Sequence, residues 1–140
     1  MDLLTPFRFR VGKKWVERRI VGGLLGHWAV WTKSAVELHA RCRQLASSGQ
    51  PVPAEMLRLN VEVTDMNAAI FDAANGFKGC IAGVHEVLRG QGLFTGIWCL
   101  DPNEKLSLGQ RAEIDRVYRA YPHLTDDAFV AANRDTWLQP

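Results

Sequence analysis

Gly26 and His27 are the residues of this chain best placed to do chemistry, because they directly follow the apolar run 21–25. A short apolar run bounded by glycines that passes straight into a periodic helix is typical of a buried parallel strand and its crossover helix. Ligands of α/β barrels bind at this carboxyl end of the strands, and a glycine lets a ligand approach the backbone closely. The sequence therefore predicts that Gly26 and His27 form the rim of a substrate pocket. The alternative is a histidine that caps the helix or packs beside Trp28.

A second group of polar residues follows one face of a predicted helix further along the chain. Asn60, Thr64 and Asn67 recur at helical spacing, with Asp65 and Asp72 nearby. Asn67 and Asp65 are candidates to orient a polar ligand. Most side-chain hydrogen bonds of such residues go to backbone groups. We therefore favour the interpretation that this stripe ties its helix to adjacent loops.

The histidines give no sign of a metal site. His39, His85 and His123 lie far apart and lack the i, i+4 pairing of a helical zinc site. His85 and Glu86 match the first half of an HExxH motif, but Arg89 stands where the second histidine is required. We therefore expect no metal, no cofactor and no catalytic residue in this chain.

The cysteines and the apolar runs bear on where the protein resides. The three cysteines are odd in number and share no CxxC spacing, which favours small core residues in a reducing compartment: Cys42, Cys80 and Cys99. No apolar run approaches the roughly 20 residues of a membrane span. The start of the chain lacks the basic residues and the long apolar stretch of a secretory signal. These features predict a cytoplasmic protein.

Composition indicates a single folded domain of ordinary type. The 140 residues are 47% hydrophobic and 23% charged, with a net charge of +2. This net charge is too small for the basic footprint of a nucleic-acid-binding protein. We therefore expect neither a nucleic acid nor a membrane as partner.

The first part of the chain predicts a β-hairpin. Residues 7–11 alternate apolar and basic side chains, residues 15–20 form a second β-prone run, and Gly12 lies between the two. Six basic residues gather in this segment: Arg8, Arg10, Lys13, Lys14, Arg18 and Arg19. Charge runs are usually solvated faces, which is the interpretation we favour. An anion-binding patch is the alternative.

Helical periodicity dominates the rest of the chain and predicts five helices. The first spans about 27–47, with the apolar stripe Trp28, Trp31, Ala35, Leu38, Cys42 and Leu45. The second starts at Pro53 and stops at Asn75-Gly76, with the stripe Leu59, Val63, Met66, Ile70 and Ala73. The third spans about 79–91, with Ile81, Val84 and Leu88 facing inward. The fourth opens at a capping box, Ser107 to Gln110, and ends before Pro122. An ordered loop that spans 95–106 precedes this fourth helix. The last helix is capped by residues 125–127 and runs through Phe129, Val130 and Trp137.

This order of elements resembles the C-terminal part of the dihydrodipicolinate synthase and N-acetylneuraminate lyase family. Four segments carry the resemblance: the strand and turn 22–29, the helix 35–45, the helix pair 68–93, and the loop and helix 100–118. The resemblance covers nearly all of this chain but only the last part of the family's length. It implies a mainly α fold, in which a bundle of about five helices follows a β-hairpin and the last strand of an incomplete (β/α)8 barrel. The boundary would separate residues 1–26 from residues 27–140.

The resemblance also implies a function. Family members are Schiff-base lyases and aldolases whose catalytic lysine lies on the sixth barrel strand, and no lysine here ends an apolar strand. The resemblance therefore implies a C-terminal segment that is inactive alone and contributes only Gly26 and His27 to a pocket rim. Its partner would be a second copy, or the remainder of the barrel, bound through the face of Trp28 and Trp31. The alternative is a self-standing helical module that binds a protein partner through its tryptophans.

Overall fold

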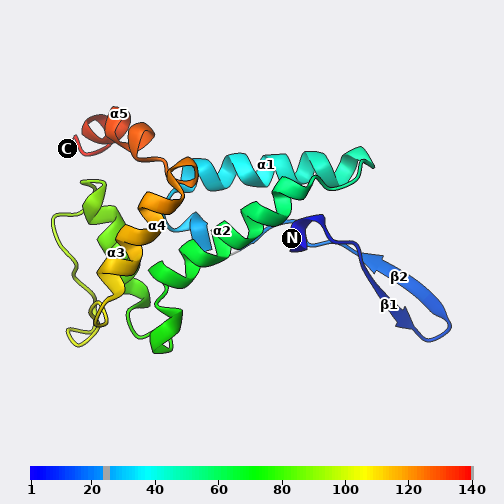
Figure 1. Ribbon diagram of the computed structural model, residues 1–140, viewed down its shortest axis with the longest axis horizontal. Helices are drawn as coiled ribbons and strands as arrows, with labels where there is room; N and C mark the ends of the chain where they lie inside the picture. Colours follow the sequence, from blue (N-terminus) through cyan, green and yellow to red (C-terminus); the bar gives the residue numbers. More distant parts are fainter. Residues whose placement is uncertain (24–25, 140) are drawn as a thin grey trace.

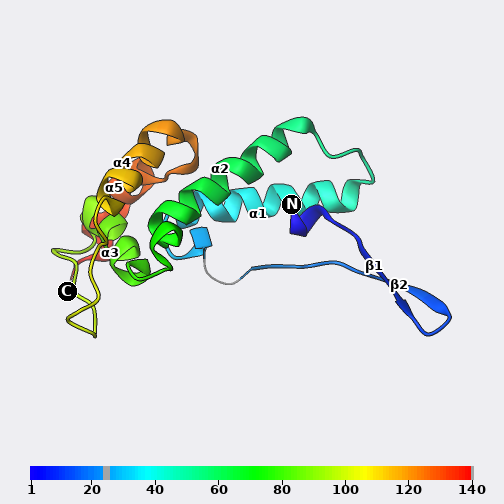
Figure 2. The same cartoon turned by 60° about the horizontal axis from the view of Figure 1, so that its bottom comes forward.

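The computed structural model describes the whole chain except Leu24, Leu25, Pro140 and the side chain of His27. Its N-terminal part is a short 3-10 turn, η1 (Asp2–Leu4), followed by the antiparallel strands β1 (Phe7–Val11) and β2 (Lys14–Arg18). Gly12, with φ of 60°, opens the two-residue turn, a position that favours glycine in hairpins. The predicted hairpin is therefore confirmed, and it stands away from the helices (Figures 1 and 2).

The strand predicted over residues 21–25 is not formed in the part that the structure describes. Residues 19–23 are exposed and form neither strand nor helix, while Leu24 and Leu25 lie outside the described residues. A buried parallel strand needs neighbouring strands on both sides. Among the described residues the only sheet is the hairpin, whose two strands pair with each other. A 3-10 turn, η2 (Gly26–Trp28), follows.

The first helix, α1 (Thr32–Ser48), begins five residues later than the sequence predicts. Trp31 precedes it with φ of 51°, a left-handed conformation that an α-helix does not contain and that is uncommon for a bulky residue. Its side chain is only 1% exposed, so packing holds this backbone conformation. Further along α1 the predicted apolar stripe is confirmed, with Ala35 and Cys42 buried.

Four more α-helices complete the described part of the chain: α2 (Ala54–Ile70), α3 (Cys80–Gly90), α4 (Gln110–Ala120) and α5 (Asp127–Trp137), with the 3-10 turns η3 (Ala73–Asn75) and η4 (Pro122–Leu124). The prediction of a mainly helical fold with five helices is confirmed. α1 packs on η1 and η2, whereas α2 packs against α3 and α4. In Figure 1, α3 and α4 lie together at the end of α2 that is far from the hairpin. The main core lies among these helices: Val30, Trp31, Met66, Ala69, Ile70, Val87, Ile114, Val117 and Leu124.

The helices α2, α3 and α4 meet at a joint built from two glycines and a buried glutamine. Gly83 of α3 lies so close to the end of α2 that an added Cβ would stand 1.9 Å from the carbonyl oxygen of Ile70. The Gln110 side-chain amide donates to the carbonyl oxygens of Gly79, at 3.0 Å, and Ile70, at 3.3 Å. The glycines allow the close approach, and Gln110 supplies a donor to the Ile70 carbonyl at the end of α2. The Gly79 carbonyl accepts from the Gly83 amide as well, at 2.8 Å.

Two helix faces differ from the sequence prediction. Ile81 is exposed, because the inward face of α3 is centred on Gly83 and Val87 rather than on Ile81. On α5 only Val130 is buried, whereas Phe129 and Trp137 are exposed. Periodicity predicts the helix. Where two adjacent faces of it both carry apolar residues, periodicity does not show which face is buried.

Candidate functional site

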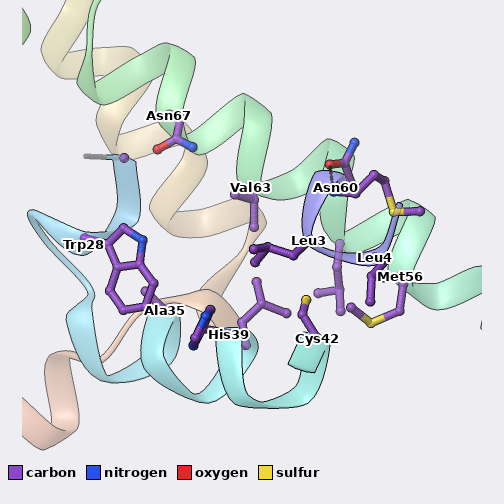
Figure 3. Close-up of a pocket in the computed structure, with 14 residues that line it drawn as sticks. Leu3, Leu4, Trp28, Ala35, His39, Cys42, Met56, Asn60, Val63 and Asn67 are labelled. Carbon is purple, nitrogen blue, oxygen red and sulfur yellow. Dashed lines mark hydrogen bonds between the residues drawn. The ribbon is translucent and has the colours of Figure 1, made fainter. Parts of the chain in front are cut away.

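A cavity of about 220 Å³ opens between α1, α2, η1 and η2 (Figure 3). Residues from four separate segments line it: Met1, Leu3, Leu4, Gly26, Trp28, Ala35, Leu38, His39, Cys42, Met56, Leu59, Asn60, Val63 and Asn67. An apolar cavity of roughly 150 Å³ already holds benzene, so this one fits a slightly larger molecule. The described residues that line it include no lysine, aspartate or glutamate.

The floor of this cavity is apolar and well buried. Leu4 of η1, Cys42 of α1 and Met56 of α2 form a small core cluster of their own. Burial raises the pKa of the Cys42 thiol above its usual value, so the sulfur is a protonated packing atom at neutral pH. The floor therefore offers dispersion contacts to a ligand and no nucleophile.

Polar side chains from both helices also line the cavity. His39 faces it from α1, where its Nε2 lies 3.3 Å from the carbonyl oxygen of Val21 and its ring meets Trp28 edge-on at 5.5 Å. Asn60 and Asn67 face it from α2, two turns apart (Figure 3). Asn60 accepts a hydrogen bond of 2.9 Å from the amino group of Met1. The arrangement combines a mostly apolar lining with a few hydrogen-bonding groups, as small-molecule pockets commonly do.

Gly26 lies on the wall of the cavity, beside α2. Its φ of 71° favours glycine, and an added Cβ would stand 3.4 Å from the side-chain oxygen of Asn67. The side chain of His27, the other residue that the sequence singles out, lies outside the described residues. Of the polar stripe on α2, Asn60 and Asn67 line the cavity with Gly26, and Asp65 does not.

Asp65 instead joins α2 to α4. Its carboxylate accepts two hydrogen bonds of 2.8 Å from the guanidinium of Arg116 and one of 2.8 Å from the Tyr121 hydroxyl. These partners hold the pKa of Asp65 below its usual value, with the Arg116 bond the largest cause. A carboxylate fixed in this way holds the fold together and is not available to a ligand.

Asp72 has a similar structural role in the turn after α2. Its carboxylate accepts from the Ser107 hydroxyl at 2.6 Å, the Gly79 amide at 2.9 Å and the Asn75 side chain at 2.7 Å. Burial pushes the pKa of Asp72 upward, but these hydrogen bonds outweigh it and leave the pKa below its ordinary value. The Ser107 amide meanwhile donates to Gln110, at 3.0 Å, so only half of the predicted capping box forms. Asp65 and Asp72 thus join α2 and the turn after it to neighbouring elements, whereas Asn60 and Asn67 of the stripe line the cavity.

The structure also brings together a thiol and an imidazole that the sequence analysis did not connect. Cys99, in the long loop before α4, has its sulfur 3.9 Å from Nδ1 of His85 on α3. Burial and the carboxylates of Glu104 and Asp101 raise the pKa of Cys99. A thiol in that environment stays protonated and unreactive at neutral pH. The spacing of residues in the sequence does not predict this contact, because the loop that carries Cys99 has no periodicity to show that it folds back onto α3.

Trp31 does not form the exposed face that the sequence analysis assigned to it. Its side chain is buried in the main core, where its Nε1 donates to the Tyr118 hydroxyl at 3.1 Å and the two rings meet edge-on at 5.2 Å. Trp31 therefore cannot contribute to the predicted binding face of Trp28 and Trp31. The left-handed backbone at Trp31 turns its side chain inward, away from the stripe of α1.

Comparison with known proteins identifies no relative of this chain. No protein-family model, no curated protein and no solved structure matches the chain. In the described part of the chain, no set of three or more histidine, cysteine, aspartate or glutamate side chains is arranged to hold a metal ion. No helix in that part has both the length and the apolar character needed to cross a bilayer.

Proposed function

We propose that this chain is the C-terminal segment of a Schiff-base lyase or aldolase of the dihydrodipicolinate synthase and N-acetylneuraminate lyase type. Its role would be to cover the last part of a (β/α)8 barrel and to contribute Gly26 and His27 to the pocket rim. The packing motifs between residues 22 and 118 that resemble this family support the proposal. The catalytic amine would come from the remainder of the barrel.

The observation that carries this proposal is the segment between β2 and η2. Ile20 is 44% exposed and Val21 is 83% exposed, although both are β-branched residues suited to a buried sheet. The described part of this segment runs extended between the hairpin and α1 (Figure 2). An exposed apolar segment a few residues before a helix is consistent with a barrel strand whose neighbouring strands belong to another part of the protein.

The lysines of the chain support a role without catalysis. All five are exposed: Lys13, Lys14, Lys33, Lys78 and Lys105. A Schiff-base lysine is activated by desolvation or by a neighbouring cation. Lys33 instead forms an ion pair with the Glu37 carboxylate at 2.5 Å on the exposed side of α1. The chain alone should therefore not form an imine with a keto acid. Since all three cysteines are free, we also place the protein in a reducing compartment such as the cytoplasm.

Two measurements test this proposal. The first is the sequence of the transcript that encodes the chain, which should specify seven strand–helix units upstream and in frame. The second is borohydride trapping with pyruvate, which should label a lysine of the joined protein and none of the isolated chain. A transcript without those units, or stoichiometric labelling of a lysine in the isolated chain, would overturn the proposal.

A self-standing protein-interaction module is the second candidate, and one observation favours it. A groove of about 460 Å³ lies between α1, α3 and α5, and three exposed apolar side chains line it: Val36, Phe129 and Trp137. Exposed apolar residues that gather in a groove are typical of a binding surface. A transcript that encodes this chain alone would favour this candidate over the lyase segment.

A further inference from the structure

The charge of the chain is concentrated in one small element. Residues 7–19 contain six of the 17 basic residues and one of the 15 acidic residues, so this segment carries +5 while the rest of the chain carries −3. The net charge of +2 hides this asymmetry. The segment is the β1–β2 hairpin and the residue that follows it.

The basic residues of the hairpin are not neutralised by the rest of the fold. Arg19 lies 3.8 Å from Glu17, and Arg8 stacks over the Trp15 ring at 5.8 Å. Among the described residues, no ion pair joins Arg10, Lys13 or Lys14 to a carboxylate. On the helices, by contrast, Arg116 and Arg89 each hold a carboxylate at 2.8 Å or less. The hairpin therefore presents free positive charge to an external anion.

Large apolar side chains are interleaved with these charges on both faces of the hairpin. The strand register pairs Phe9 with Val16 on one face and Arg10 with Trp15 on the other. Phe9 is 47% exposed and Trp15 is 65% exposed. The hairpin points away from the helices, so nothing in the described fold covers either face (Figures 1 and 2). An isolated two-stranded ribbon is marginal in water, and contact with a partner would stabilise it.

We propose that the β1–β2 hairpin binds the surface of anionic lipid bilayers. Lys13 and Lys14 at the turn would contact the anionic headgroups, while Phe9 and Trp15 would lie at the boundary with the acyl chains, where aromatic residues are enriched. A bilayer interface surrounds an inserted hairpin on both sides, whereas a single nucleic-acid strand stacks its bases along one face. The aromatic residues on opposite faces thus favour the lipid surface.

The proposal is independent of the lyase proposal, because the family resemblance begins only at Gly22. It revises our expectation that the protein has no membrane partner. That expectation was based on the net charge of the whole chain and on the lack of a membrane-spanning segment. Surface binding needs neither a spanning helix nor a large net charge of the whole chain. The −3 of the helical part would be repelled by anionic lipid, so the hairpin alone would touch the bilayer.

Co-flotation of the full chain with vesicles tests the proposal. We expect binding to vesicles of equimolar phosphatidylserine and phosphatidylcholine at low salt, and little binding to phosphatidylcholine alone. Each basic residue near such a surface strengthens binding about fivefold, so K13Q/K14Q should weaken it about 25-fold. W15S should weaken it by about tenfold or more, because it removes a large apolar side chain from the interface.

A matched control separates the hairpin from the overall charge. K78Q/K105Q makes the same change in net charge at two exposed lysines outside the hairpin and should leave binding within about twofold. Circular dichroism should show the same helix content for all variants. The proposal is overturned if the wild-type chain does not float with anionic vesicles, if both double variants lose binding equally, or if W15S binds like the wild type. Tighter binding to an oligouridylate than to the vesicles, measured by fluorescence anisotropy, would overturn it in favour of a nucleic acid.

Discussion

Replacement of Gly83 by alanine tests the joint between α2, α3 and α4 most directly. The added Cβ would stand 1.9 Å from the Ile70 carbonyl oxygen and 2.6 Å from the Gln110 amide nitrogen. Because the first of these is a backbone atom, the two helices must separate by roughly 1 Å or more to restore van der Waals distance. Overpacking of this kind costs about 1–3 kcal/mol, and a buried carbonyl that loses its donor costs about 1–3 kcal/mol more. Alanine regains about 1 kcal/mol in helix propensity.

The net expectation is a loss of about 1–5 kcal/mol in the free energy of unfolding, which lowers the melting temperature by about 3–17 °C. Thermal unfolding followed by circular dichroism measures it, with urea unfolding as a second probe. Gly90→Ala is the matched control, because Gly90 lies on the same helix and an added Cβ there meets nothing within 4 Å. Gly90→Ala should unfold at or slightly above the wild-type temperature. If Gly83→Ala melts within about 2 °C of Gly90→Ala, the close approach of α2 and α3 is not as described.

Three further outcomes follow from the core, the ion pairs and the thiols. Ile70→Ala should destabilise the protein by about 2–5 kcal/mol in urea unfolding, whereas Val61→Ala on the exposed face of the same helix should change stability by less than about 0.5 kcal/mol. Arg116 and its neighbours lower the folded-state pKa of Asp65, so its contribution is present above the unfolded pKa of about 3.9 and is lost as the pH falls further. The difference between the urea midpoints at pH 7 and pH 3 should therefore be smaller in Asp65→Asn than in the wild type. The same difference in both proteins would contradict this. Cys99 should react slowly with a thiol reagent at pH 7 and faster only at alkaline pH, and rapid modification of the folded chain at neutral pH would show an activated thiol.

Local patterns in the sequence were sufficient for the elements whose geometry depends on nearby residues. The hairpin follows from alternation around Gly12, and the buried faces of α2 and α4 follow from the spacing of Met66 and Ile70 and of Ile114 and Val117. In each case the signal and the structure involve residues a few positions apart. The same holds for Asn60 and Asn67, whose helical spacing brings both to the cavity.

Features that depend on distant residues could not be predicted in this way. The inward turn of Trp31 depends on its contact with Tyr118, 87 residues later in the chain. His39 lies at the cavity beside Val21 and Trp28, which precede α1. The periodicity of α1 therefore could not predict these contacts. The run 21–25 shows the converse case. Its composition predicts a strand, but the described residues include no partner strand beside it, and residues 21–23 form none.

The start of α1 depends on a residue near the end of the chain. The Lys33 amide donates to the Asp126 carboxylate at 3.0 Å, and the Ser34 hydroxyl donates to the Thr125 carbonyl at 2.9 Å. The first of these bonds joins residues 93 positions apart. At roughly 5–20 residues per second, a ribosome needs roughly 5 to 19 s to make the intervening chain. During that time α1 lacks the acceptor that caps its first turn, and the nascent helix is exposed to fraying until Asp126 emerges. During synthesis there is therefore an interval of seconds in which α1 has formed but its hydrogen bond to Asp126 cannot yet form.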